Sequence, residues 1–291
     1  MTGAVGRGRD QAHWRLRVVH TTGYRYATPV TQSYNEARLT PCSDDRQNLM
    51  VSRLETVPPT RAYRYMDYWG TEVNSFDLQA PHTELKVVAS SVVETGAQPG
   101  PVETAGWADV RSASSLDRYG EYLEWTAYVP KDRELAAIAR TLRKGQTPSD
   151  TVLAVSKWVH DKLTYQRGTT GVHSSAVDAW QAGEGVCQDY AHLTLAMLRA
   201  IGVPARYVSG YLHTKPDAAV GETVVGESHA WIEAWTGGWW GFDPTNDIPI
   251  GHRHVWVATG RDYGDVSPLK GIYSGGAATA IEVTVDMTRL A

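Results

Sequence analysis

One cysteine in the sequence stands where a helix is expected to begin. Cys187 follows the segment Gly183-Glu-Gly-Val186, and a helix is expected from there to about Ile201, where Gly202 and Pro204 form a stop signal. The free N–H groups and the dipole at a helix N-terminus favour an anion, so this position favours the thiolate form of a cysteine. A neighbouring backbone N–H could also donate to an oxyanion formed at an attacked carbonyl. The alternative is a buried, unreactive cysteine.

A histidine and an aspartate lie at positions from which they could assist this thiol. His229 is near the start of the extended run from Ser228 to Trp235, and Asp243 follows a second run after the turn at Gly237-Gly238. Antiparallel pairing of the two runs would bring the imidazole and the carboxylate together. Asp243 could then orient His229, and His229 could take the thiol proton. Taken singly, a structural histidine and a turn-capping aspartate are the alternatives.

Other side chains could contribute to the same site. Gln181 lies six residues before Cys187 and could stabilise an oxyanion, although it could also be a solvated residue at a helix end. Trp231 and Trp240 could line a substrate groove or pack in the core. Cys42 lies in the N-terminal half, and we expect it to be a bystander thiol.

Two further histidines have a spacing that can hold a metal ion. His252 and His254 form an H-x-H pair and would share one face of a strand. No third ligand converges on them in the sequence, so we expect a loop or the rim of the site, with no metal and no cofactor. The polar residues directly after Cys187 have a structural explanation, because Gln188 and Asp189 are expected to cap or anchor the helix start.

The elements that would hold these residues begin with strands. Short extended runs without helical periodicity fill the first hundred residues, at 13–20, 34–40, 49–57, 73–78 and 84–93. Residues 21–23 are expected to form a turn. Regularly spaced short strands predict a β-rich domain over residues 1–100, a sandwich or a barrel. A stretch rich in glycine and proline at 96–106 marks its boundary.

Helical periodicity begins after this boundary. Helices are expected at 131–144, from Thr147 onward, at 176–182 and at 187–201. Extended runs follow at 205–212, 228–235, 239–242, 254–258 and 281–285. Helices followed by strands, without β-α-β alternation, are typical of an α+β domain, which we expect over residues 107–291. The segment 213–226 is expected to be a mobile flap beside the site.

Composition and charge exclude several classes of protein. The 28 Lys and Arg residues against 32 Asp and Glu residues give a net charge of −4, so no basic excess exists for nucleic-acid binding. Apolar stretches fall short of the ~18 residues of a membrane span, so no membrane partner is expected. With 2 cysteines and no apolar segment typical of a signal peptide, the sequence predicts a cytoplasmic protein.

Several of these segments together resemble a known family. Two of them resemble the core of the transglutaminase-like superfamily: Gly185-Val-Cys-Gln-Asp-Tyr-Ala-His192 and Gly202-Val-Pro-Ala-Arg-Tyr-Val-Ser-Gly-Tyr211. Two more resemble its histidine and aspartate segments: His229-Ala-Trp231 and Phe242-Asp-Pro-Thr-Asn246. The N-terminal half resembles the β-rich domain of the bacterial branch described as cysteine proteases. The resemblance implies a papain-like α+β core, with the cysteine, histidine and aspartate named above at its catalytic positions.

The chemistry expected from these residues is attack of a thiolate on an amide carbonyl. Hydrolysis of an amide or peptide bond through a thioester is the leading hypothesis, because water is present at ~55 M and transfer to an amine needs a site that excludes it. Transglutaminase-type amide formation or deamidation would use the same three residues. A binding or scaffold protein with an inactive triad is the main rival, and a metal-dependent hydrolase is a more distant one. The expected partner is a peptide, a protein or a small amide, and the oligomeric state stays open.

Overall fold

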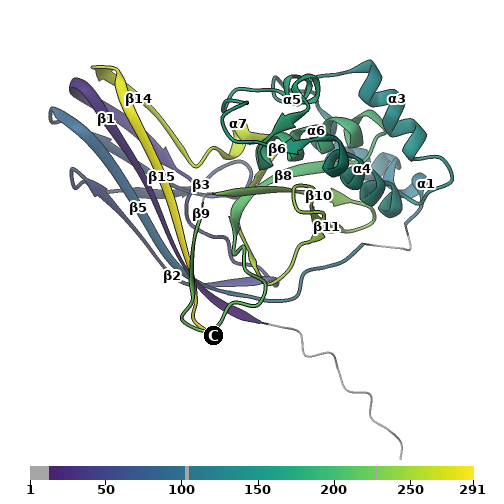
Figure 1. Cartoon of the computed structure of the whole chain (residues 1–291), viewed down its shortest axis with the longest axis horizontal. Coiled ribbons are helices and arrows are strands. Elements are labelled where there is room, and N and C mark those ends of the chain that lie inside the picture. The colour runs from purple at the N-terminus through teal and green to yellow at the C-terminus, as the bar shows by residue number, and fades with distance from the viewer. Residues whose placement is uncertain (1–12, 102–104, 227) are drawn as a thin grey trace, which may run out of the picture.

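A computed structural model describes residues 13–101, 105–226 and 228–291 of the chain. Figure 1 shows two parts side by side, a long curled antiparallel sheet and a unit in which helices cover a second sheet. This arrangement confirms the expected α+β class with a β-rich N-terminal part. No helix in the described ranges is long and apolar enough to cross a membrane.

The large sheet has eight strands within the described residues. Its central strand is β1 (Trp14–Ala37), which is 24 residues long. The others are β2 (Gln47–Val57), β3 (Tyr63–Met66), β4 (Glu72–Leu78), β5 (His82–Thr95), β9 (Thr223–Gly226), β14 (Leu269–Gly275) and β15 (Ala278–Arg289). The main path through the sheet runs β2-β5-β1-β15-β9.

The turn expected at residues 21–23 is not formed, because β1 runs straight through this segment. Gly23 pairs with Lys86 of β5 on one side and with Glu282 of β15 on the other. Pairing along both edges holds the backbone extended where glycine alone would weaken a strand. A register shift against β5 comes further along, between Arg25 and Val30, where an irregular ladder allows the strand to bend.

Strand pairing also corrects the expected division into 1–100 and 107–291. β15 pairs with β1 from Leu16, opposite Arg289, to Tyr26, and β14 and β9 join the same sheet. The last strands of the chain therefore complete the N-terminal sheet. The sequence pattern shows that a segment is a strand but does not show which strand it pairs with.

The segment 213–226, expected to be a flap, is tied to this sheet. Its last part forms β9, which pairs with β15. Arg289 donates a hydrogen bond of 2.7 Å to the carbonyl of Ala218 and accepts one of 2.7 Å from the N–H of Gly221. A free loop would lack such long-range bonds, so the segment is part of the fold.

The second part of the molecule contains the helices and a five-stranded sheet. The helices are α1 (Trp107–Val110), α2 (Ala113–Tyr119), η1 (Gly120–Leu123), α3 (Arg133–Leu142), α4 (Pro148–Lys162), α5 (Ala176–Ala182), α6 (Cys187–Ala200) and α7 (Tyr263–Val266). The sheet runs in the order β12 (Ile248–Pro249), β11 (Trp239–Asp243), β10 (His229–Trp235), β8 (Ala205–Leu212) and β13 (His254–Gly260). A small parallel pair joins β6 (Thr164–Tyr165) and β7 (Glu184–Gly185).

Helix α6 lies at the centre of this part. Every residue from Gln188 to Arg199 is buried, as expected for a helix surrounded by other elements. Ala230 and Ile232 of β10 belong to the same apolar cluster, and so does Leu16 of β1. One continuous core therefore joins the two parts and holds the N-terminus of α6 against the large sheet.

Candidate functional site

Cys187 is the first residue of α6, as predicted. The carboxylate of Asp189 accepts the N–H of Val186 at 2.8 Å and the hydroxyl of Thr170 at 2.7 Å, which confirms that Asp189 anchors the helix start. A side chain at Gly185 would place its Cβ 2.6 Å from this carboxylate, so the close approach requires glycine. Because it lies in the first turn, the N–H of Cys187 has no intrahelical acceptor and can donate to a bound group.

His229 and Asp243 meet across two neighbouring antiparallel strands. Nε2 of His229 lies 2.7 Å from Oδ2 of Asp243. The register of β10 and β11 pairs Ile232 with Phe242, which places His229 and Asp243 diagonally on one face of the sheet. The hairpin predicted from the sequence therefore forms with the register that the contact needs.

The Asp243 carboxylate is fully buried and is surrounded by donors. Its Oδ1 accepts the backbone N–H groups of Thr245 at 2.9 Å and Asn246 at 3.2 Å. Its Oδ2 accepts the side-chain amide of Asn246 at 2.7 Å, beside His229. Burial alone would raise the pKa of Asp243, but the charge and hydrogen bond of His229, together with the nearby His254, lower that pKa well below its usual range. The group is therefore an anion at neutral pH.

The third member of the site, Cys187, lies on the other side of the His229 ring. Its side chain is within hydrogen-bonding reach of the imidazole. Nε2 of His229 is engaged by Asp243, so Nδ1 is the nitrogen left for the thiol. Burial would lower the pKa of His229, but the charge and hydrogen bond of Asp243, helped by Cys187, raise it overall. A protonated imidazole beside the thiol is thus favoured electrostatically.

Cys187 and His229 line a cavity of about 380 Å³, here called the thiol cavity. The helical part contributes Tyr207, Ser209 and Tyr263, and the large sheet contributes His20, Thr22, Tyr24, Leu269 and Val283. The N-terminal sheet therefore supplies a wall of the site. Residues 13–20 and 281–285 were expected to be strands, but nothing in their pattern indicated that they face the cysteine.

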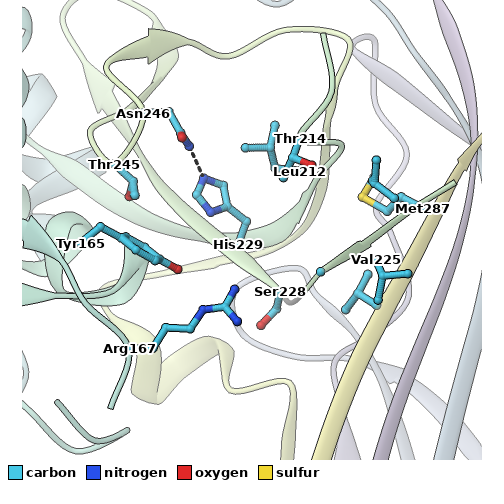
Figure 2. Close-up of a pocket in the computed structure, with 13 residues that line it drawn as sticks. Tyr165, Arg167, Leu212, Thr214, Val225, Ser228, His229, Thr245, Asn246 and Met287 are labelled. Carbon is cyan, nitrogen blue, oxygen red and sulfur yellow. Dashed lines mark hydrogen bonds between the residues drawn. The ribbon is translucent and has the colours of Figure 1, made fainter. Parts of the chain in front are cut away.

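A second cavity of about 340 Å³ lies on another side of the histidine. Figure 2 shows Asn246 directed at the His229 ring, with Tyr165 on one side and Met287 on the other. The two cavities share Tyr165, Ser228 and His229 as lining residues. His229 is therefore accessible from two directions.

Gln181 does not lie in either cavity. It is exposed near the end of α5, and the glutamine that lines the thiol cavity is Gln188. The amide of Gln188 donates to the carbonyl of Val172 at 3.3 Å and so holds the neighbouring loop. The left-handed Gly183 ends α5 and turns the chain before it reaches Cys187, which leaves Gln181 outside the site.

The two candidate groove tryptophans are also absent from both cavities. Trp231 and Trp240 are each 1% exposed. The ring of Trp231 packs edge-on against His254, and the indole N–H of Trp240 donates to a threonine inside the core. Beyond His229 this face of β10 is covered, because Glu233 pairs with Arg46 from the N-terminal part. That segment buries Trp231, whereas Trp240 pairs with Ala234 and lies on the opposite face of the sheet, in the apolar cluster with Ala230 and Ile232. Both tryptophans are therefore core residues.

His254 corrects the expectation of a rim position. It is the first residue of β13, it is 3% exposed, and its Nε2 lies 3.6 Å from Oδ2 of Asp243. His252 is separate from it and packs on the ring of Trp14, with ring centroids 4.8 Å apart. The start of the extended run at 254 was a signal that His254 is in a strand, whereas the neighbouring Gly251 suggested a loop.

His229, Asp243 and His254 are close enough to surround a metal ion, since their ligand atoms lie within 4.8 Å of one another. Their hydrogen bonds indicate a different use. An ionised carboxylate can only accept a hydrogen bond, so Nε2 of His229 must carry the proton that lies between it and Asp243. The N–H of Gly251 donates to Nδ1 of His254 at 3.2 Å, which puts the proton of the neutral ring on Nε2. Neither nitrogen offers a lone pair to a metal, and the three side chains form a proton network.

Comparison with known proteins extends over nearly the whole chain. Residues 136–244 match the model of the transglutaminase-like superfamily, and residues 16–94 match the bacterial transglutaminase-like N-terminal region. An uncharacterized protein of Mycobacterium leprae is 56% identical over 278 residues, 96% of this chain and 100% of that protein. An uncharacterized protein of Mycobacterium tuberculosis is 34% identical over 296 residues, 94% of this chain and 92% of that protein.

Two further similarities concern proteins with descriptive names. A protein-glutamine gamma-glutamyltransferase of Pseudomonas aeruginosa is 26% identical over 152 residues, which cover 50% of this chain and 23% of that protein. The crystal structure of a candidate cysteine protease from Cytophaga hutchinsonii has a TM-score of 0.78 at 23% identity, over 97% of this chain and 92% of that chain. The fold is therefore shared along almost the full length. Because both family models match this sequence and two relatives are similar to it over nearly their full length, the chain belongs to the transglutaminase-like superfamily.

Proposed function

We propose that this protein is a cysteine hydrolase that cleaves amide or peptide bonds through a thioester on Cys187. One observation carries the proposal: the His229 imidazole binds the buried Asp243 carboxylate at 2.7 Å and lines the same cavity as the Cys187 side chain. This contact takes place in a cavity large enough for a small ligand or a short peptide segment.

The mechanism follows from the positions of these groups. The Cys187 thiolate attacks the carbonyl carbon of the amide. The oxyanion that forms accepts a hydrogen bond from the free backbone N–H at the start of α6. Protonated His229 then donates from Nδ1 to the departing amine as the C–N bond breaks, which leaves a thioester on Cys187. Neutral His229 next takes a proton from water, the resulting hydroxide attacks the thioester, and the thiol is restored with release of the acid. Asp243 stays ionised and orients the ring throughout.

Acyl transfer to an amine is the second candidate, favoured by the second cavity. Because this cavity also reaches His229, an amine in it could be deprotonated by the same imidazole and attack the thioester in place of water. The partial similarity to a protein-glutamine gamma-glutamyltransferase supports this alternative. Transfer additionally requires that water be kept from the thioester.

A single assay separates these readings. Casein is incubated at pH 7 with the protein, with and without a fluorescent primary amine, and new peptide N-termini and incorporated label are both quantified by mass spectrometry. Hydrolysis predicts peptide release without label, and Cys187→Ala should abolish it. Label that exceeds peptide release would replace the hydrolase proposal with the transferase. Equal results for the wild type and Cys187→Ala would refute both and favour a scaffold.

A further inference from the structure

We infer that His254 is a positioning residue of this site, whose neutral imidazole directs an N–H at the Asp243 carboxylate and holds it for His229. The inference rests on the proposed function, and it adds a fourth side chain to the three that the sequence singled out. It starts from a geometric fact: Nε2 of His254 is 3.6 Å from the carboxylate oxygen that binds His229.

The tautomer of His254 is set by the turn before β13. Gly251 and His254 are joined twice, since the N–H of His254 donates to the carbonyl of Gly251 at 2.9 Å and the N–H of Gly251 donates to Nδ1 of His254 at 3.2 Å. Nδ1 must therefore be the acceptor nitrogen of the ring. The remaining proton is on Nε2, on the side of Asp243.

Burial makes this N–H matter. Nε2 of His254 is buried and has no hydrogen-bond partner among the described residues, which is an uncommon and costly state for a polar atom. At 3.6 Å its contact with Asp243 is too long for a hydrogen bond, and it acts as a dipole directed at a charge. The side chains of His254 and Asp243 are 2% and 0% exposed, so water screens this attraction little.

The charge state of His254 decides whether it helps. Asp243, His229 and Arg253 act on it electrostatically, and burial is the largest cause of the lowered pKa of His254. Arg46 and Glu233, which pair with each other, lie with it around a small cavity on its other side. A neutral His254 ring stabilises the Asp243 carboxylate and leaves its negative charge in place. A protonated His254 would compensate that charge and weaken the attraction between Asp243 and protonated His229.

The consequence concerns the thiolate–imidazolium pair. In any thiolate–imidazolium pair the two groups are coupled, so one apparent pKa belongs to forming the pair and another to losing it. Support of Asp243 by His254 stabilises the protonated imidazole and therefore extends the pH range of the pair at its alkaline end, where the imidazolium loses its proton; the acidic end, where the imidazole is protonated on both sides of the transition, should not move. Removal of the Nε2 donor should narrow this range without removing a group that touches the substrate.

Two substitutions of similar polarity isolate the donor. In His254→Asn the amide oxygen can still accept from Gly251, but the side chain is too short to reach Asp243. In His254→Gln the amide N–H₂ takes the place of Nε2–H. The matched control is His252→Gln, because His252 packs on Trp14 away from the carboxylate.

The experiment measures the rate of Cys187 alkylation by iodoacetamide between pH 4.5 and 11, by mass spectrometry of the Cys187 peptide, because the pKa of His229 is raised to about 10. His254→Asn should lower the midpoint of the alkaline step in this profile, where the imidazolium loses its proton, by about one pH unit and leave the acidic step unmoved. His254→Gln should stay within about twofold of the wild type, and His252→Gln should match it. Cys42 reports unfolding in the same samples, since burial raises the pKa of its thiol to about 12 in the folded protein.

The outcomes separate this inference from the proposed function. A wild-type protein that labels only like an ordinary thiol would refute the proposed function itself. A wild type that labels at low pH, with His254→Asn giving the same profile, would leave the function standing and overturn the role of His254. If His254→Asn and His254→Gln narrow the pH range of the pair equally while Cys42 stays unlabelled, the role of the Nε2 donor is overturned as well. Should Cys42 label in His254→Asn, His254→Leu replaces it as the donor-free variant.

Discussion

Replacement of Asp243 by asparagine tests the proposed site most directly, because it removes one charge and keeps the shape. Oδ1 of Asp243 accepts two backbone N–H groups, from Thr245 and Asn246, so the oxygen of the new amide must occupy that position. Its NH₂ group then faces His229, where Oδ2 accepted a hydrogen bond before. His229 has to offer a lone pair there, and its proton moves to the nitrogen beside Cys187. An imidazole in that tautomer cannot take the thiol proton.

The size of the effect can be worked out from ordinary thiol chemistry. A thiol that ionises near pH ~8.5 is only ~0.3% thiolate at pH 6, whereas a thiol paired with an imidazolium is almost fully ionised, a difference of about 300-fold. The more basic thiolate is the better nucleophile, and a Brønsted slope of ~0.4–0.5 over a pKa difference of about 3.5 units recovers roughly 25–55-fold. Alkylation of Cys187 in Asp243→Asn should therefore be about tenfold slower than in the wild type at pH 6, and the variant should become the faster of the two above pH ~8.

The assay is iodoacetamide labelling across pH 5–9, with Asp217→Asn in an exposed loop as the matched control. Unlabelled Cys42 verifies that each variant is folded. A folded Asp243→Asn protein that labels at the wild-type rate at pH 6 would refute the argument, since neither the charge nor the tautomer of His229 would then control the thiol.

The same pair predicts how stability depends on pH. Folding lowers the pKa of Asp243 and raises that of His229. The Asp243 contribution is present above pH ~3.8 and is lost as the pH falls through its lowered pKa. The His229 contribution is present below pH ~6.5 and is lost as the pH rises through its raised pKa. The difference in Tm between the wild type and Asp243→Asn should therefore be largest between these limits and shrink in alkali.

Three further predictions concern parts of the molecule around this pair. Glu233→Gln removes the buried anion that Arg46 and Arg206 share, although Arg46 keeps its ion pair with Asp44, and should destabilise the fold by about 3 kcal/mol, a fall in Tm of roughly 6–10 °C. Glu55→Gln, in an exposed ion pair, should leave the Tm unchanged. Gly185→Ala would place a Cβ 2.6 Å from the capping carboxylate of Asp189, so alkylation of Cys187 at pH 6 should fall and the free energy of unfolding should drop by ~1–2 kcal/mol. Gly171→Ala is the control, because a Cβ there meets nothing within 4 Å. Treatment with EDTA should leave Cys187 labelling unchanged, and a loss that zinc restores would contradict the proton-network interpretation.

Local features of the fold could be read from the sequence because neighbouring residues produce them. The start of α4 at Pro148 follows from Thr147, whose hydroxyl accepts the N–H of Asp150 at 3.1 Å. The start of α6 at Cys187 follows in the same way from glycines and a capping aspartate. Caps and turns involve residues three or four positions apart, so their hydrogen bonds are written in the local sequence.

The contact between His229 and Asp243 was also within reach of the sequence. The two residues are only 14 positions apart, and the Gly237-Gly238 turn fixes the register of the hairpin that joins them. The position of Cys187 beside them came from the family resemblance and from the requirement that a thiol needs a base. Helix α6 packs on β10 through apolar side chains of both elements.

Other features were decided by tertiary structure alone. His254 was assigned to a rim because its neighbours are a glycine and an arginine, yet the packing of β13 against β8 buries it beside Asp243. Trp231 was a candidate for a groove, and a segment more than 180 positions earlier, which contains Arg46, covers its strand.

The sequence by itself determined the chemistry available to this protein: a cysteine at a helix start, and a histidine and an aspartate on one hairpin. Only the tertiary structure decided what surrounds that chemistry. β14 and β15 pair with β1. This pairing places Leu269, Val283 and His20 in the wall of the thiol cavity. The physical reason is that a strand's pattern of apolar residues records which face is buried, whereas its pairing partner depends on the shape and open edges of the whole fold.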